Sequence, residues 1–270
     1  MKRNLYFDHH LHTSFSPDAD PQASMERYIE RAQELGIAGF VLTDHLDLDT
    51  PVILFQKTID YRPYYKKFLQ LKKQSNIALR MGIEIGYQPH LHEALNDVLG
   101  KVPFDFVICS MHLTDQLDYY NGDFFIGKTQ DEAYQRYFES VKEAVIAYDN
   151  YDVFGHLDYI IRYGDYAIKD YSIERYESII KEILIIIIKK GKGIEINTSG
   201  LRYGLNTTHP KFEVIQWFKE LGGTIITIGS DAHKVADLTK DFDVAFSLLK
   251  KAGFTSFTVF ENRKPTFINF

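Results

Sequence analysis

Two histidines near the N-terminus are spaced so that their side chains could bind one metal ion. His10 and His12 follow residues 5–7, a short apolar run that is typical of a β-strand. Residues two apart in an extended segment point to the same side, so both imidazoles can converge on one point beside Asp8. An isolated pair of this kind can also only hydrogen-bond to neighbouring loops. The rest of the chain has to decide between the two interpretations.

Further side chains that bind metals follow later apolar runs, or lie just inside them. They are His45, Glu84, His112, His156, Asp231 and His233. With the first pair they mark six of the seven strands that the sequence predicts. Scattered core histidines would not all choose the C-terminal end of a strand, so the joint placement favours a metal site.

Predicted strands and helices alternate along the chain. The strands are residues 5–7, 40–43, 78–87, 106–109, 151–154, 194–197 and 224–228, and the helices are residues 24–35, 61–74, 90–99, 129–147, 173–190, 210–221 and 235–252. Such alternation implies parallel strands joined by crossover helices. A closed barrel gathers all its strand ends at one mouth, whereas an open sheet gathers only those near its switch point. The sequence therefore predicts an α/β fold, a distorted (β/α)7 TIM-like barrel, as a single domain over residues 1–270.

The composition is that of an ordinary globular protein, with 45% hydrophobic and 25% charged residues. A formal net charge of -6 without a long basic cluster argues against a nucleic-acid partner. The single Cys109 excludes an intrachain disulfide and is expected in the core. Residues 183–188, the most apolar segment, are too few to span a bilayer. No signal-peptide core is visible, so we expect a cytoplasmic protein without a membrane partner.

Four histidines are not expected to bind the metal directly. By strand alternation His9 points away from its two neighbours, and His209 precedes a proline in a loop, so surface or supporting roles are predicted for both. His90 and His92 begin a helix, where residues two apart diverge around the axis.

The remaining donors are too many for one tetrahedral ion. Six histidines stand with Glu84, Asp231 and Asp18, which suits two or three ions with Glu84 or Asp231 as a bridge. Imidazole and carboxylate donors without thiolate fit zinc, iron or manganese.

The ordered motifs resemble those of the PHP superfamily, named for polymerase and histidinol phosphatase. They are DHHLHT at residues 8–13, TDH at 43–45, GIEIG at 82–86, SMH at 110–112, GHLDY at 155–159 and GSDAH at 229–233. The stretches HLDYIIRYG and EINTSGLR are most similar to its stand-alone histidinol-phosphate phosphatase branch. The resemblance implies a barrel of PHP type that holds three divalent or transition metal ions.

The same resemblance divides the donors among the three ions. By motif, the first ion would be held by His10, His12, Glu84 and Asp231, the second by Glu84, His112 and His156, and the third by Asp18, His45 and His233. Some family members have histidine where this chain has Asp18. A carboxylate there lowers the charge of the third site, which leaves the identity of its ion most open.

The implied activity is hydrolysis of a small phosphate monoester, L-histidinol phosphate, in histidine biosynthesis. We expect a hydroxide between the first two ions to attack phosphorus in line. Arg162 is the first choice and Arg202 the second for gripping the phosphoryl oxygens, because guanidinium binds phosphate bidentately. Asp231, or a metal-bound water, would protonate the leaving alcohol.

Histidinol carries a cationic amine, which calls for an acidic or aromatic wall. Asp158, Glu195 and the tyrosines of residues 117–128 are the candidates, while Asp44 could orient a ligand histidine. Residues 46–59 form the other long connection that could act as a wall or lid.

Two alternatives stay open. One is a PHP phosphoesterase for nucleotides, a nucleic-acid 3′ end or phosphotyrosine, although net acidity argues against a polymeric nucleic acid. The other is a non-catalytic, metal-stabilised binding module, which the competent donor at every matched ligand position disfavours. The native metals and the oligomeric state do not follow from the sequence.

Overall fold

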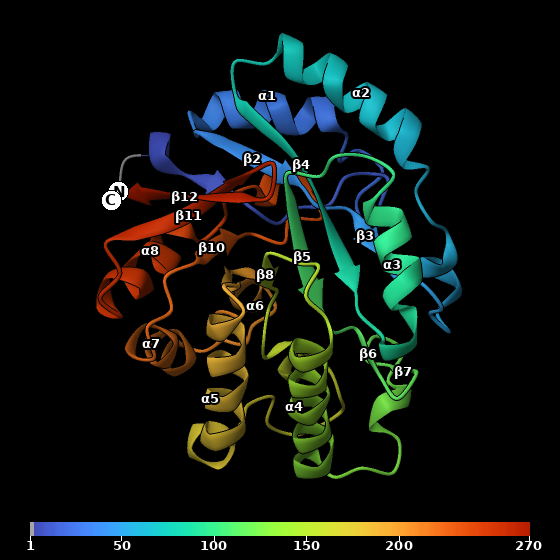
Figure 1. Ribbon diagram of the computed structural model, residues 1–270, viewed down its shortest axis with the longest axis vertical. Helices are drawn as coiled ribbons and strands as arrows, with labels where there is room; N and C mark the ends of the chain where they lie inside the picture. Colours follow the sequence, from blue (N-terminus) through green and yellow to red (C-terminus); the bar gives the residue numbers. More distant parts are fainter. Residues whose placement is uncertain (1–2) are drawn as a thin grey trace.

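Seven parallel strands form a nearly closed barrel with helices around its outside, as the sequence predicts (Figure 1). The structure, a computed structural model, describes residues 3–270. In spatial order the barrel strands are β1 (Phe7–Asp8), β2 (Gly39–Leu42), β4 (Ala78–Gly86), β5 (Phe106–Ser110), β8 (Val153–Phe154), β9 (Gly193–Asn197) and β10 (Ile226–Gly229). The short β3 (His45–Leu46) pairs with β4 beyond the end of β2.

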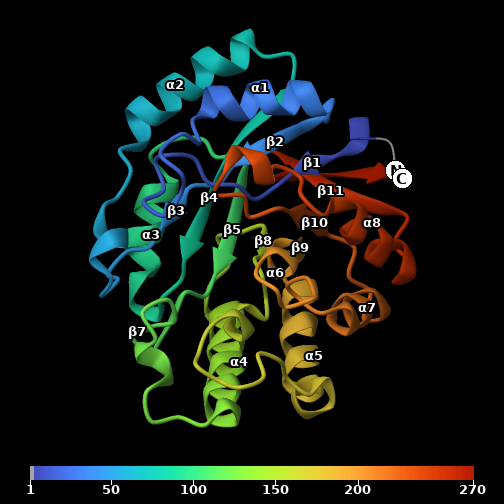
Figure 2. The same cartoon turned by 180° about the vertical axis from the view of Figure 1, so that it is seen from behind.

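All the helices but the last lie between successive barrel strands in the chain, and the last one follows β10. They are α1 (Met25–Leu35), α2 (Tyr61–Gln74), α3 (His92–Leu99), α4 (Gln130–Ala147), α5 (Ile173–Lys189), α6 (Ser199–Arg202), α7 (Phe212–Glu220) and α8 (Phe242–Lys251). Figures 1 and 2 show α1 and α2 on one side of the barrel, with α4 and α5 on the opposite side. Because helices cover the strands, every residue of β2, β5, β9 and β10 is buried.

The helix of residues 173–190 is buried along one face, as expected for its isoleucine-rich run. Tyr176, Ile180, Ile183 and Ile187 of α5 are buried, and Ser172 caps the helix by accepting a hydrogen bond from the Arg175 N–H. Over the described part of the chain, no helix combines the length and the apolar character that crossing a membrane requires.

The first and last barrel strands meet through backbone hydrogen bonds that close the barrel. The His9 N–H donates to the Ile228 oxygen at 3.0 Å, and the Asp231 N–H donates to the His10 oxygen at 2.7 Å. In a regular parallel ladder His9 itself would accept the second bond, so the residue that bonds to the neighbouring strand changes here from His9 to His10. The regular alternation on which the prediction for His9 depended is therefore interrupted between His9 and His10.

His9 is wholly buried, so its predicted surface position is wrong. Its ring centre lies 4.9 Å from that of Phe7 and 5.6 Å from that of Phe106, and its Nδ1–H donates to the Ile228 oxygen at 3.2 Å. Burial lowers the pKa of His9 to about 4, so this imidazole is a neutral core residue.

The predicted helix over residues 235–252 is interrupted. After a short 3-10 turn the chain passes through Thr239 and Asp241, both with positive φ, before α8 begins. The Thr239 N–H donates to Asp8 Oδ2 at 2.8 Å. A tertiary hydrogen bond thus takes a backbone donor that a continuous helix would have used.

The apolar stretch 257–260 belongs to a hairpin at the N-terminal end of the barrel. It comprises β11 (Ser256–Glu261) and β12 (Lys264–Asn269), joined through Asn262 and Arg263, which both have positive φ. The Phe260 ring centre lies 5.0 Å from that of Phe106, so the hairpin packs against the start of β5. The opposite, C-terminal end of the barrel is left open for chemistry.

Candidate metal centre and active site

All nine side chains predicted as metal ligands gather at the C-terminal end of the barrel. Four groups of three have their ligand atoms within 4.8 Å of one another: His12, His45 and His233; His10, His12 and Asp231; His10, Glu84 and His156; and His45, Glu84 and His112. Asp18 joins them because its Oδ2 lies 2.9 Å from His233 Nε2 and 3.6 Å from His45 Nε2. The shared members make one continuous cluster.

Glu84 lies at the centre of this cluster and faces imidazoles with both oxygens. Its Oε2 is 2.8 Å from His45 Nδ1 and 3.3 Å from His10 Nε2. Its Oε1 is 2.8 Å from His156 Nε2 and 3.4 Å from His112 Nε2. A carboxylate whose two oxygens face separate pairs of donors has the geometry of a bridge between two ions.

Local backbone structure explains how these side chains converge. His45 stands opposite Glu84 in the β3–β4 pairing, so the short β3 delivers its imidazole to the carboxylate. Asp231 follows β10 with a φ of 53°, a left-handed conformation that is uncommon outside glycine and costs free energy. Such strain is typical of positions that a functional site holds in place.

The imidazoles and carboxylates of the cluster shift one another's pKa values in both directions. The imidazoles of His10 and His12 present Nε2 atoms 3.1 Å apart. Burial, together with the nearby His45, lowers the pKa of His12 well below its ordinary value. Burial by itself would raise the pKa of Glu84, but the surrounding imidazoles outweigh it and hold that pKa well below the usual range. Burial alone would lower the pKa values of His10 and His45, but the neighbouring carboxylates outweigh it and raise both. A cation that binds here would therefore displace protons from these imidazoles.

Two buried carboxylates fix the orientation of two histidines of the cluster. The His10 Nδ1–H donates to Glu195 Oε1 at 2.7 Å, and the His112 Nδ1–H donates to Asp47 Oδ1 at 2.7 Å. Both bonds leave Nε2 free to bind a metal. Glu195 is wholly buried behind His10, so its predicted place on the substrate wall is wrong. Asp47 is not among the residues predicted from the sequence, although it stands two residues after His45 in an extended segment.

Asp44 supports the ligand histidines through an intermediate, Ser16. Asp44 Oδ1 accepts a hydrogen bond from Ser16 Oγ at 2.6 Å. Ser16 Oγ in turn accepts from the His12 Nδ1–H at 3.3 Å and from the His45 backbone N–H at 3.1 Å. Asp44 therefore acts one step further from the histidines than the sequence suggested.

Asp158 does not line the site either. It is wholly buried, its Oδ1 accepts from the His209 Nδ1–H at 2.8 Å, and its Oδ2 accepts from the Tyr171 hydroxyl at 3.0 Å. A carboxylate engaged in this way is not free to bind a substrate amine, so that prediction is also wrong. His209 is wholly buried in a supporting position rather than at the surface.

The two remaining non-ligand histidines stay outside the cluster, as expected. His90 Nε2 lies 2.7 Å from the exposed Asp49 carboxylate, and His92 Nε2 lies 2.7 Å from the Tyr87 hydroxyl. Cys109 is a buried free thiol, in agreement with its predicted place in the core.

The two candidate arginines converge on Asp231. Arg162 Nη1 lies 3.6 Å from Asp231 Oδ2, and the Arg162 guanidinium stacks on the Tyr203 ring, 3.4 Å from its centre. Arg202 Nη2 donates to the Asp231 backbone oxygen at 2.8 Å. The Nη1 atom of each arginine is buried without a hydrogen-bond partner in the described structure. Buried cationic donors of this kind suit an anionic ligand.

A cavity of about 260 Å³ opens onto the cluster. Seven of the nine predicted ligands line it, all but His10 and His12. The rest of the lining is Asp47, Thr50, Phe55, Asp118, Tyr119, Tyr120, Tyr159, Arg162, Tyr163, Tyr203 and Lys234. Phe55 and Tyr120 come from the two loops predicted as walls, and their ring centres lie 5.9 Å apart. That prediction is confirmed, and the cavity is of a size for a small molecule.

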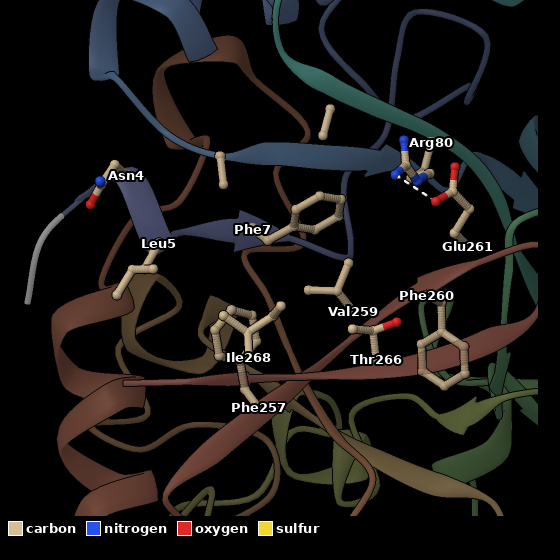
Figure 3. Close-up of a pocket in the computed structure, with 12 residues that line it drawn as sticks. Asn4, Leu5, Phe7, Arg80, Phe257, Val259, Phe260, Glu261, Thr266 and Ile268 are labelled. Atoms are coloured by element: carbon tan, nitrogen blue, oxygen red, sulfur yellow. Dashed lines mark ion pairs between the residues drawn. The ribbon is translucent and has the colours of Figure 1, made fainter.

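A second cavity, of about 400 Å³, lies at the opposite end of the barrel beside the hairpin. Figure 3 shows its mainly apolar lining, which includes Phe7, Phe257 and Ile268, with Arg80 paired to Glu261 at 3.0 Å. Its described lining has no histidine, so the smaller cavity is the one with the means for chemistry.

Comparisons with known proteins agree with this geometry. Residues 8–199 match the model of the PHP domain. The chain is 32% identical to the histidinol-phosphatase of Lactococcus lactis subsp. lactis over 95% of both chains, and 30% identical to a probable histidinol-phosphatase of Clostridium acetobutylicum over 97% of this chain and 96% of that one.

One solved structure is similar over nearly the whole chain. It is the crystal structure of histidinol phosphate phosphatase from Lactococcus lactis complexed with zinc, L-histidinol and phosphate. Its TM-score is 0.88 at 30% sequence identity, covering 96% of this chain and 98% of that one. With the match to the family model and the full-length relatives, this shows that the chain belongs to the PHP domain family.

Proposed function

We propose that this chain is a metal-dependent phosphomonoesterase that hydrolyses L-histidinol phosphate to L-histidinol and phosphate. The observation that carries the proposal is the cluster of nine metal-binding side chains that shares a small cavity with Arg162. Full-length similarity to histidinol-phosphatases, one of them with L-histidinol and phosphate bound, supports the substrate.

The proposal includes three ions of zinc, iron or manganese, divided among the ligands as the family motifs imply. The two-sided contacts of Glu84 support its role as the bridge, and zinc in the Lactococcus lactis structure supports that metal. When bound, such ions would lower the pKa of coordinated water toward neutrality and offset charge on the phosphoryl oxygens.

The chain's own groups would then hold the phosphoryl group and move protons. Arg162 lines the cavity and would bind phosphoryl oxygens. Arg202, which donates to the Asp231 backbone oxygen through Nη2 and keeps its Nη1 without a partner in the described structure, would be the second phosphate-binding arginine. Burial would raise the pKa of Asp231, but neighbouring imidazoles hold it well below the ordinary range. Asp231 would therefore have to take a proton from the attacking water before passing it to the leaving alcohol.

The histidinol part would lie against the aromatic and acidic side of the cavity. Asp118 carries a carboxylate on its lining, and Tyr119, Tyr120 and Tyr159 offer ring faces there. A carboxylate and aromatic faces both favour a cationic amine. Asp118 thus takes the role that the sequence analysis gave to Asp158.

We further propose a single domain and a cytoplasmic location. Asp231 and His233 lie beyond residues 8–199 matched by the family model, yet β10 closes the barrel against β1. Because the predicted ligand set includes residues that follow the last barrel strand, we take residues 1–270 as one folding unit. The single buried cysteine supports a reducing compartment.

A substrate panel tests the proposal. Purified, metal-quantified protein would be assayed for phosphate release from L-histidinol phosphate, nucleoside monophosphates and phosphotyrosine at equal concentrations. We expect the highest kcat/KM for L-histidinol phosphate and loss of that activity in His10→Ala. A wide preference for another ester would overturn the substrate assignment, and turnover of none of them by metal-loaded protein would overturn the phosphatase itself.

A further inference from the structure

A buried pair of side chains lies outside the cavity and has no part in the chemistry described so far. The His209 Nδ1–H donates to Asp158 Oδ1 at 2.8 Å, and neither residue is exposed to solvent. Asp158 Oδ2 accepts two further hydrogen bonds, from the Lys211 N–H at 3.0 Å and from the Tyr171 hydroxyl at 3.0 Å. The carboxylate is therefore fully engaged in holding the chain near residue 209.

This pair joins the two loops that carry the arginines. Asp158 immediately precedes the 3-10 turn Tyr159–Arg162, at whose end Arg162 lies. His209 closes the loop of residues 198–208 at its base, because the Asn197 N–H donates to the His209 oxygen at 2.7 Å and the His209 N–H donates back at 2.9 Å. That second loop carries Arg202.

The two loops also touch at the cavity. There the guanidinium of Arg162 stacks on the ring of Tyr203, which follows Arg202 directly. The loops are thus linked at two places, a buried hydrogen-bonded base and a half-exposed stack. Because a stack alone leaves the loops free to slide, the buried pair is the link that can fix their spacing.

We propose that Asp158 and His209 are positioning residues that set the separation of Arg162 and Arg202 for binding the phosphoryl group. This inference rests on the proposed phosphatase function. A phosphate has several oxygens, and two guanidiniums bind it together only when their spacing matches, so a displacement of about 1 Å is costly. His209 would act through the loops without touching the substrate.

The test compares two substitutions of the same residue. His209→Leu removes the hydrogen bond to Asp158 while keeping an apolar side chain of similar bulk, whereas His209→Asn keeps an N–H donor near the position of Nδ1. Inorganic phosphate is the probe, and its Kd for metal-loaded protein is measured by calorimetry beside KM and kcat for L-histidinol phosphate. Metal content and the unfolding temperature are recorded for each variant.

We expect His209→Leu to raise the Kd for phosphate and KM about tenfold at unchanged metal content, and His209→Asn to stay within about threefold of the unsubstituted protein. If His209→Leu does not fold, Asp158→Asn is the second variant that weakens the hydrogen bond between the two residues. A lower unfolding temperature with unchanged Kd and KM would assign the pair a purely structural role and overturn the proposal.

The outcomes also separate this inference from the proposed function. Should the unsubstituted protein bind phosphate yet leave L-histidinol phosphate intact, the substrate assignment fails while the phosphate Kd still tests the pair.

A double substitution adds a further check. Because the pair and the stack hold the same two loops together, Tyr203→Leu combined with His209→Leu should weaken phosphate binding by less than the product of the two single effects. Independent, multiplying effects would contradict the proposal.

Discussion

Replacing Glu195 with glutamine should weaken metal binding without removing a ligand. Glu195 Oε1 accepts from the His10 Nδ1–H at 2.7 Å, and Oε2 accepts from the His156 backbone N–H at 3.0 Å and from Asn197 Nδ2 at 3.1 Å. All of these partners are donors. A glutamine amide would therefore set its own NH2 group against one of them and would remove the charge that steadies His10.

The expected size follows from the effect of comparable partners of metal-bound histidines. Their loss typically lowers metal affinity by about 10- to 100-fold, or ~1.4–2.7 kcal/mol. Titration of metal-free protein with zinc against a competing chelator measures that affinity. Asp105→Asn is the matched control, because Asp105 is also buried and accepts from the Met81 and Asn262 N–H groups, but at the other end of the barrel.

The affinity for zinc should fall in Glu195→Gln and stay unchanged in Asp105→Asn, even if both substitutions lower the free energy of unfolding. An unchanged zinc affinity in Glu195→Gln would refute the reasoning that this carboxylate orients His10. Equal losses of affinity in both variants would attribute the effect to general destabilisation instead.

Three further predictions concern Arg162, Gly229 and His9. Arg162→Ala should lower kcat/KM for L-histidinol phosphate by about 10²-fold at unchanged metal content, and a loss below about threefold would remove Arg162 from phosphoryl binding. Gly229→Ala should reduce both zinc affinity and the free energy of unfolding, the latter by about 1–3 kcal/mol, because the new methyl group would overlap Glu195 Oε1 and His10 Cβ. Retention of both quantities would contradict the packing described for Glu195. Burial lowers the pKa of His9 from 6.5 to about 4, so its stabilising neutral form is fully present above about pH 6.5 and its contribution is lost as the pH falls toward 4. The free energy of unfolding, measured with urea, should therefore fall between about pH 7 and about pH 5 by ~2 kcal/mol less in His9→Leu than in the unsubstituted protein. Equal falls in the two proteins would exclude His9 as the source of this pH dependence.

The barrel and the gathering of its ligands could be predicted from the sequence because both depend on local patterns. Each barrel strand is a short apolar run, and side chains such as His112 and His156 follow such runs directly. Parallel strands connected by helices must bring those ends together, whatever the details of packing. The positions of the donors relative to the strands were therefore sufficient to predict that the donors gather at one end of the barrel.

Features that depend on contacts between distant segments could not be predicted in this way. His9 lies in the core through its contacts with Phe7 and Phe106, and no local pattern around DHHLH announces this burial. Glu195 and Asp158 look like free acids in the sequence, but His10 and His209, far along the chain, engage them. The interruption before α8 likewise depends on a hydrogen bond to Asp8.

Asp47 is different, since a local signal was present. It follows His45 by two residues, and extended spacing would have placed both on one face. Its carboxylate lies 3.5 Å from His45 Nδ1 as well as accepting from His112. The two-residue spacing at a strand end therefore predicts Asp47 as well, once carboxylates are considered beside histidines.

Reconstitution of metal-free protein tests the central claim most directly. Chelated protein would be titrated with zinc, and separately with manganese or ferrous iron, while phosphate release from L-histidinol phosphate and bound metal are both measured. We predict negligible hydrolysis without metal and full hydrolysis at about three ions per chain. Full hydrolysis by protein that holds no metal would contradict the account.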